Sequence, residues 1–115
     1  MTPSQLAALP DSLHILGAIE SGDIWLNDVW LDPMLSEQLL DANAVGDGFN
    51  WGKLYHKPDQ LSLAILLEYM PVGEALNYYK DFRYRVISEL PQTNFDIIIN
   101  LRQEIEEIIK LKIIK

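Results

Sequence analysis

The chain has 115 residues, of which 49% are hydrophobic and 23% charged, with 6 Gly, 6 Pro and no Cys. This length suits one domain with a modest core, and the apolar fraction excludes intrinsic disorder. The lack of Cys excludes disulfides, thiol catalysis, iron–sulfur clusters and thiolate zinc sites. No apolar run approaches the roughly 18–20 residues of a membrane span, and the first residues lack the basic group of a secretory signal. We therefore expect a cytoplasmic protein with no membrane partner.

The charge is distributed unevenly along the chain. Residues 1–52 hold eight of the 17 acidic residues and not one Lys or Arg, whereas residues 53–115 hold nine acids and all nine bases. An acidic half repels nucleic acid and anionic membranes, so we expect no direct nucleic-acid binding and favour a basic protein partner. The alternative is that the acids serve only solubility.

The first half of the sequence predicts a small antiparallel sheet. Residues 2–5, Thr-Pro-Ser-Gln, form a capping pattern that begins a helix ending near residue 9. Residues 13–19 and 24–26 are predicted as strands joined by a Gly-containing turn, and 29–31 follow after a second turn. This hairpin or three-stranded meander must pack on helices, because an isolated ribbon is marginal in water.

The next segment predicts a helix of about two turns. Asp32 is a suitable N-cap and Pro33 suits the first helical position, so the helix should extend to residue 40. Its inward residues are predicted to be Leu35, Leu39 and Leu40.

The second half predicts mostly helix. Helices are expected over 58–70 and 74–90, followed by a short strand over 95–99 and a last helix capped by Asn100. Asp81 and Arg85 are spaced to pair on the helix over 74–90. Its inward side is predicted to consist of Ala75, Leu76, Tyr79, Phe82, Val86, Ile87 and Leu90.

No repeat or linker divides the chain, which predicts a single α+β domain over 1–115. Its architecture is a hairpin or three-stranded meander packed against three to four helices. The acidic hairpin or meander half covers 1–52 and the helical half covers 53–115.

Few residues suggest catalysis. The Gly-containing segments lack the spacing of phosphate-binding loops, and no nucleophile elbow is present. One His with scattered carboxylates does not make a metal site, so no catalytic residue, metal or cofactor is predicted. The alternative is a small-ligand-binding or hydrolytic domain using the loop over 41–59, with a pocket formed by Asp47, Trp51, Tyr55, His56 and Asp59.

Trp25 and Trp30 lie on the acidic meander with a turn between them. If their strands pair, one Trp can face the helices and the other solvent. An exposed Trp among acids forms an interaction patch, because Trp is enriched at binding hot spots. The alternative places both Trp in the core. The partner-binding hypothesis names Asp23, Asp28, Asp32, Trp25 and Trp30.

Two motifs point to a family. They are Gly48-Phe49-Asn50-Trp51-Gly52 with the later Pro58-x-Gln60-Leu61 helix, and Ala75-Leu76-x-x-Tyr79-x-x-Phe82 followed by Leu90-Pro91. Over about residues 20–110 the chain resembles a small bacterial and phage family, the domain of unknown function 6166. The resemblance implies a shared architecture often carried by mobile elements, and no activity. The family's glycine-rich connection is replaced here by Lys53-Leu54-Tyr55-His56-Lys57.

Together these features predict a non-enzymatic interaction protein. The hypothesis is a phage-borne or mobile-element accessory or inhibitor that binds a basic, nucleic-acid-binding protein, as anti-CRISPR-like inhibitors of defence nucleases do. A third possibility is a homodimer formed through the apolar tail over 111–114.

Overall fold

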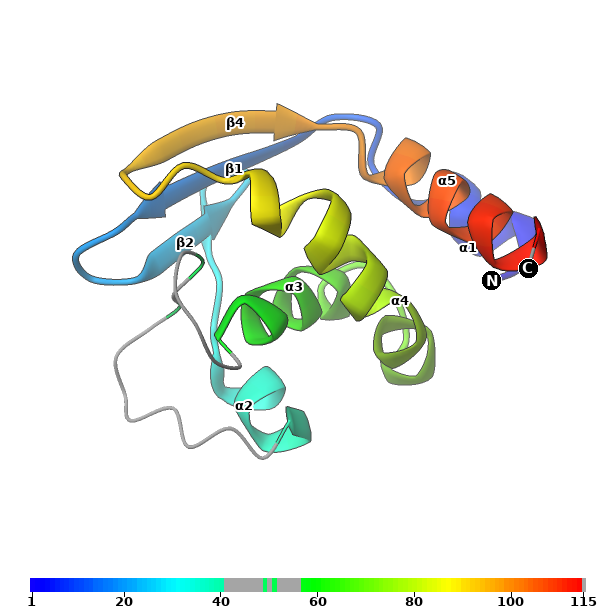
Figure 1. The fold of residues 1–115 in the computed structure, drawn as a ribbon, viewed down its shortest axis with the longest axis horizontal. Coiled ribbons are helices and arrows are strands. Elements are labelled where there is room, and N and C mark those ends of the chain that lie inside the picture. Colours follow the sequence, from blue (N-terminus) through cyan, green and yellow to red (C-terminus); the bar gives the residue numbers. More distant parts are fainter. Residues whose placement is uncertain (41–48, 50, 52–56, 115) are drawn as a thin grey trace.

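The computed structural model describes residues 1–40, 49, 51 and 57–114. Its helices and antiparallel strands confirm the α+β fold class (Figure 1). In chain order the elements are α1 (Pro3–Ala7), β1 (Leu13–Ala18), β2 (Asp23–Leu26), β3 (Val29–Trp30), α2 (Met34–Leu40), α3 (Lys57–Leu67), α4 (Val72–Arg85), the 3-10 helix η1 (Ile87–Glu89), β4 (Phe95–Ile99) and α5 (Leu101–Ile114).

The strands form one four-stranded antiparallel sheet in the order β3-β2-β1-β4. The predicted meander supplies three strands, and β4 adds the fourth by pairing with β1 from far along the sequence. Between β2 and β3 the chain reverses at Asn27 and Asp28, whose φ angles are 47° and 69°. Positive φ at both residues gives a turn whose twist matches the strands, and Asn and Asp tolerate it well.

The two faces of the sheet have different surroundings. In β1 the side chains alternate between buried and half-buried positions, as expected for a sheet covered on one face. Figure 1 shows α2, α3 and α4 on one side of the sheet, with α1 and α5 towards one end. None of the helices in the described ranges covers the opposite face.

The hydrophobic core lies between the sheet and the helices. Residues 60–66 of α3 are all buried, which makes α3 the central helix. Trp51 is 3% exposed, its indole N–H donates to the Pro91 carbonyl at 2.8 Å, and its ring meets that of Phe95 edge to face at 5.0 Å. Trp51 therefore links the segment before α3 to the start of β4.

Helix α2 begins as predicted but orients differently. Asp32 caps it, because its Oδ1 accepts the Met34 N–H at 2.9 Å. The predicted burial of Leu35 and Leu39 is wrong, since they are 47% and 37% exposed. Ser36 is buried instead, and its hydroxyl donates to the Pro33 carbonyl at 2.9 Å, which satisfies the polar group locally.

Helix α4 departs from the prediction at one position, since the other predicted inward residues are buried or partly buried. Leu76 is 40% exposed, whereas Tyr78 is buried in the core. The predicted pairing of Asp81 with Arg85 is replaced by contacts with α5. The Arg85 Nε donates to Glu104 Oε2 at 2.8 Å, and the Lys112 Nζ lies 3.6 Å from Asp81 Oδ2. Packing of α5 on α4 thus determines which charges meet.

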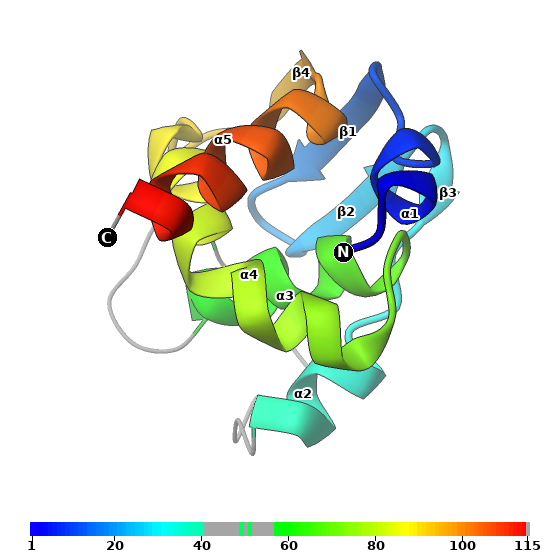
Figure 2. The ribbon, with the colours of Figure 1, turned by 90° about the vertical axis from the view of Figure 1, so that its right-hand side faces the viewer.

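Helix α5 lies against α4 and α1 (Figure 2). Asn100 caps it as predicted, since its Oδ1 accepts the Gln103 N–H at 2.9 Å. Arg102 donates to the Ala7 and Leu9 carbonyls at 3.2 and 3.0 Å, which joins both ends of the chain. No helix within the described ranges is long and apolar enough to span a membrane.

Candidate interaction surface

The uncovered face of the sheet carries a mixed set of aromatic, aliphatic and acidic side chains. This face carries the half-buried residues of β1. The strand register adds the residues of β2 and β4 that lie directly opposite them, and the residue of β3 opposite Trp25. We call this surface the open face. It consists of His14, Leu16 and Ala18 of β1, Asp23 and Trp25 of β2, Trp30 of β3, and Asp96 and Ile98 of β4.

One row of residues crosses all four strands of the open face. Asp96 lies opposite Leu16, Leu16 lies opposite Trp25, and Trp25 lies opposite Trp30. Directly opposed residues share a face, so both indoles are on the outside, with Trp30 51% exposed and Trp25 half-buried. The prediction that one Trp faces the helices is therefore wrong, and so is the alternative that both lie in the core.

The charged groups of the open face are carboxylates. Asp23 Oδ1 accepts the indole N–H of Trp30 at 3.0 Å, which holds that ring against β2. Asp96 Oδ1 lies 2.5 Å from Nε2 of His14, across the β1–β4 pair. Asp28 is exposed at the turn beside the face.

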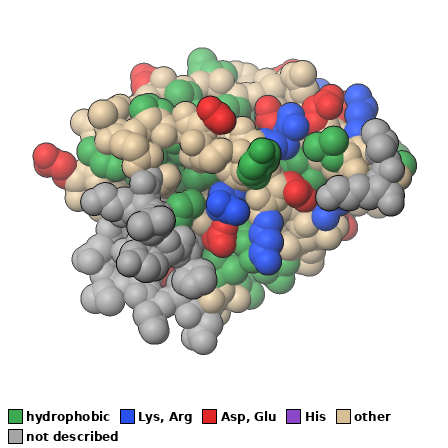
Figure 3. All heavy atoms as spheres, viewed as in Figure 1, with side chains coloured by type: hydrophobic (Ala, Val, Ile, Leu, Met, Phe, Trp, Pro, Cys, Tyr) green, Lys and Arg blue, Asp and Glu red, His purple; other side chains and the backbone are tan. Residues whose placement is uncertain are grey.

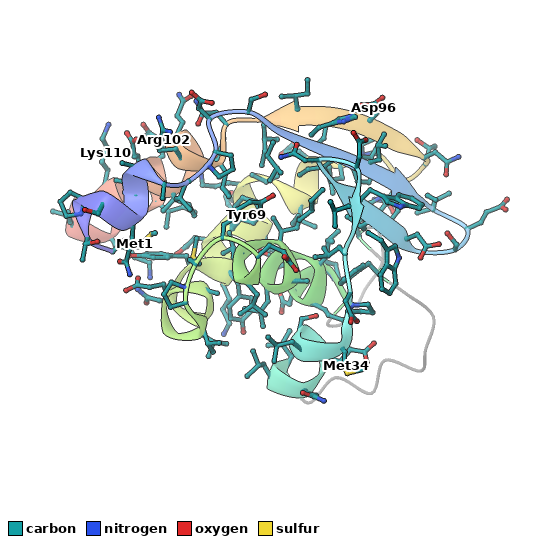
Figure 4. The ribbon with its side chains drawn as sticks, turned by 180° about the vertical axis from the view of Figure 1, so that it is seen from behind. Met1, Met34, Tyr69, Asp96, Arg102 and Lys110 are labelled. Carbon is teal, nitrogen blue, oxygen red and sulfur yellow. The ribbon has the colours of Figure 1, made fainter. Side chains whose placement is uncertain are left out.

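None of the four strands contains Lys or Arg. Figure 3 shows the basic side chains over the helical part of the surface. In Figure 4, Asp96 lies on the sheet while Arg102 and Lys110 lie along α5, towards the other end. The open face therefore carries carboxylates that no Lys or Arg of its own strands balances. The basic side chains that the structure describes are those of Lys80, Arg83 and Arg85 on α4 and Arg102, Lys110 and Lys112 on α5.

A shallow depression of about 550 Å³ lies on the open face. Leu16 and Ala18 of the inner strand β1 line it together with Trp25 of β2. The segment 94–96, at the start of β4, and Asp28 also border it. The depression is thus apolar and has a carboxylate on each of two sides.

The structure brings together four of the five residues of the partner-binding hypothesis. Asp23, Trp25 and Trp30 belong to the open face, and Asp28 borders it. Asp32 lies beyond β3, where its carboxylate caps α2.

Asp96 and His14 also belong to this surface, and the sequence alone did not predict them. Alternation within 95–99 places Asp96 and Ile98 on one side of β4, but nothing local shows that β4 pairs with β1.

Two residues of the alternative loop site are described, and each has contacts elsewhere in the fold. Trp51 is buried in the core beside Phe95, and Asp59 of α3 lies 2.6 Å from Nε of Arg83 on α4. Asp47, Tyr55 and His56 lie outside the described residues. Among the residues that are described, no three His, Asp or Glu side chains gather as a metal site would require.

Comparison with known proteins identifies one family. Its model, described as a family of unknown function (DUF6166), matches residues 19–111. No curated protein and no solved structure matches the chain. The match begins just after β1 and includes β2, β3 and β4, together with α2, α3, α4 and most of α5. The chain therefore belongs to this family of unknown function, DUF6166.

Proposed function

We propose that this chain is a non-enzymatic interaction protein that binds a basic protein partner through the open face. The observation that carries the proposal is the pair Trp25 and Trp30, side by side on a sheet face that no described helix covers. Three carboxylates, those of Asp23, Asp28 and Asp96, surround the pair, and the strands supply no Lys or Arg.

The composition of the open face matches that of a binding surface. Interfaces commonly have an aromatic centre that loses its water on binding and a polar rim that stays wet. Trp30 presents a large apolar ring at 51% exposure, and Ile98 at 69% extends the apolar area on β4. The carboxylates then select a positively charged partner and accelerate its encounter.

The proposal includes the type of partner. A protein surface that binds nucleic acid is rich in Lys and Arg, so it is complementary to an acidic face. We propose that the partner is such a protein in the cytoplasm, and that this chain is an accessory or inhibitor carried by a phage or other mobile element. The chain would act by covering the surface that otherwise contacts phosphate groups.

The test begins with affinity capture from the organism that encodes the protein, followed by purification of each captured protein. We expect a basic protein whose Kd rises steeply between 50 and 300 mM salt, because exposed charges are screened over about 10 Å at 0.1 M ionic strength. Trp30→Ala should weaken binding at least tenfold, as expected for a central aromatic anchor.

A matched pair of charge reversals tests the location. Asp96→Lys on the open face and Glu89→Lys on η1 change the net charge equally, and both residues are exposed. We expect Asp96→Lys to abolish binding and Glu89→Lys to leave it nearly unchanged. Equal losses for the two variants, or a Kd that does not respond to salt, would show that the open face is not the binding surface.

A further inference from the structure

We propose that the depression on the open face receives one arginine side chain of the basic partner. The inference rests on the proposed function and specifies its chemistry. The arginine would lie over β1, between Trp25 on β2 and Asp96 on β4.

The register of the sheet determines the shape of this site. Trp25 and Asp96 are both opposite Leu16, on the two neighbours of β1. Adjacent strands lie about 4.8 Å apart, so the backbones that carry Trp25 and Asp96 are separated by roughly 10 Å. Leu16 and the small Ala18 lie between them and form an apolar floor. This space suits an elongated side chain with an apolar stem and a polar end.

The electrostatics of the depression favour a cation. Asp96 borders it on one side and Asp28 on another, and both are exposed. Nε2 of His14 lies 2.5 Å from Oδ1 of Asp96. Within the described residues, no hydrogen bond is made to Oδ2, the other carboxylate oxygen of Asp96. The indole of Trp25 adds a π face, which attracts a cation placed over it. An anionic ligand would meet two carboxylates and is disfavoured.

The chemistry of the floor favours arginine over lysine. A guanidinium group is planar, weakly hydrated and able to donate two parallel hydrogen bonds to a carboxylate. A lysine ammonium group is a compact, strongly hydrated charge that loses more on leaving water. An apolar floor with a carboxylate at its edge therefore suits the guanidinium better.

The experiment is an NMR titration of the purified full chain with N-acetyl-arginine methylamide at millimolar concentrations. The corresponding lysine and citrulline compounds serve as probes of charge and shape, because citrulline has the shape of arginine without its charge. We expect the arginine compound to shift the Trp25 indole resonance saturably, with the lysine compound weaker and the citrulline compound weakest.

Variants of the site provide the second readout. Trp25→Leu and Asp96→Asn should each weaken binding of the arginine compound two- to five-fold, as expected for one exposed cation–π contact or one exposed ion pair. Because Trp25→Leu lacks the indole, binding to the variants is followed at the backbone amide resonance of Leu16. The double variant should weaken it by more than either change alone. Glu89→Gln on η1, an exposed acid among the helices, is the matched control and should bind as the wild type does.

Two outcomes would overturn the inference. One is that the citrulline or lysine compound binds as tightly as the arginine compound, and the other is that Trp25 and Asp96 can be changed without effect. Neither outcome decides the proposed function, because Trp30 lies outside the depression and its effect on binding of the whole partner is measured separately.

Discussion

Gly17 of β1 leaves room for the ring of Phe95 in the neighbouring strand. The two residues are directly opposed, and a Cβ on Gly17 would lie 2.2 Å from Cε1 of Phe95. No real contact is that short, so Gly17→Ala must displace the ring, which is also in edge-to-face contact with Trp51. We expect a loss of about 1–3 kcal/mol in the free energy of unfolding, measured by denaturant titration.

Gly73 provides the matched control for that substitution. It lies in the first turn of α4, where a Cβ would meet nothing within 4 Å. Gly73→Ala should therefore leave the stability unchanged or raise it by about 0.4–1 kcal/mol, because Ala restricts the unfolded chain. Equal effects of the two substitutions would contradict the packing of Phe95 on Gly17.

Asp28 adopts a left-handed backbone conformation in the turn between β2 and β3, with φ of 69°. Asp28→Gly should preserve or slightly raise the melting temperature, because Asn-Gly is the favoured pair for such a turn. Asp28→Val should lower the free energy of unfolding by about 1–2 kcal/mol, since a β-branched residue resists positive φ. A thermal melt of the two variants would disprove this turn geometry if they behaved alike.

A substitution at Asp28 can also test the effect of charge on binding without disturbing the fold. Asp28→Gly removes one carboxylate beside the depression without straining the turn. Replacing Asp28 by Lys, in contrast, would combine a reversed charge with a strained backbone, so a loss of binding could not be assigned to charge alone. The glycine variant is therefore the cleaner probe of the acidic rim.

At the scale of the elements, we expect the loss of the Trp51 indole to destabilise the fold much more than the loss of the Trp30 indole. Trp51 is 3% exposed and joins Pro91 to Phe95, whereas Trp30 is 51% exposed on a two-residue strand. Trp51→Ala should cost about 3–5 kcal/mol of stability. Trp30→Ala should cost less than about 1 kcal/mol, because solvent already covers half of the ring. Urea unfolding of both variants, followed by tyrosine fluorescence or circular dichroism, compares the two.

Because of two tyrosines of the helical layer, we expect the free energy of unfolding to fall at alkaline pH. Burial raises the pKa of Tyr69, with Glu68 adding repulsion, and burial raises the pKa of Tyr78, with Glu74 adding repulsion. The folded state then holds these protons more tightly than the unfolded state does. The stability they contribute is complete below the ordinary tyrosine pKa of 10.0 and is lost as the pH rises above it, through the raised values.

The measurement is the free energy of unfolding at pH 9 and pH 11 for the wild type and for the variant with both Tyr69→Phe and Tyr78→Phe. We expect a smaller decline in the variant, since Phe has no proton to lose. An identical decline would mean that other groups determine the alkaline limit.

For the whole molecule, the oligomeric state tests the homodimer alternative. Leu111 and Ile113 are 51% and 78% exposed near the end of α5. Residues two apart on a helix do not face the same side, so these two side chains do not form one apolar stripe. Lys112, between them, lies near Asp81 and over the ring of Tyr78. We therefore expect a monomer by light scattering at high protein concentration, and a dimer that Ile113→Glu abolishes would contradict this.

The charge of −8 is also a property of the whole molecule. The basic side chains that the structure describes lie on α4 and α5, and several of them pair with nearby acids, such as Arg83 with Asp59 and Arg85 with Glu104. The acids of the sheet have no Lys or Arg partner within the strands. The carboxylates of the open face therefore produce a negative electrostatic potential there, which attracts a basic partner.

By itself, the sequence determined most of the elements of this protein and several of their ends. Pro, Asn, Asp and Thr act on the adjacent backbone, so the caps at Asp32 and Asn100, the turn at Asn27 and the strand over 95–99 could be predicted locally. The family also followed from the order of short motifs along the chain.

Only the tertiary structure decided which surface these elements form. The pairing of β4 with β1 joins Asp96 to Leu16 across 80 residues of chain, and no local pattern encodes it. Placement of both indoles on the open face depended on the strand register, which a shift of one residue would reverse. Leu35, Leu39 and Leu76 were misplaced because α2 and α4 carry apolar residues on more than one side, and packing on α3 and α5 selects which of them are buried. Local rules act within a few residues, whereas a binding surface is made by contacts between distant ones.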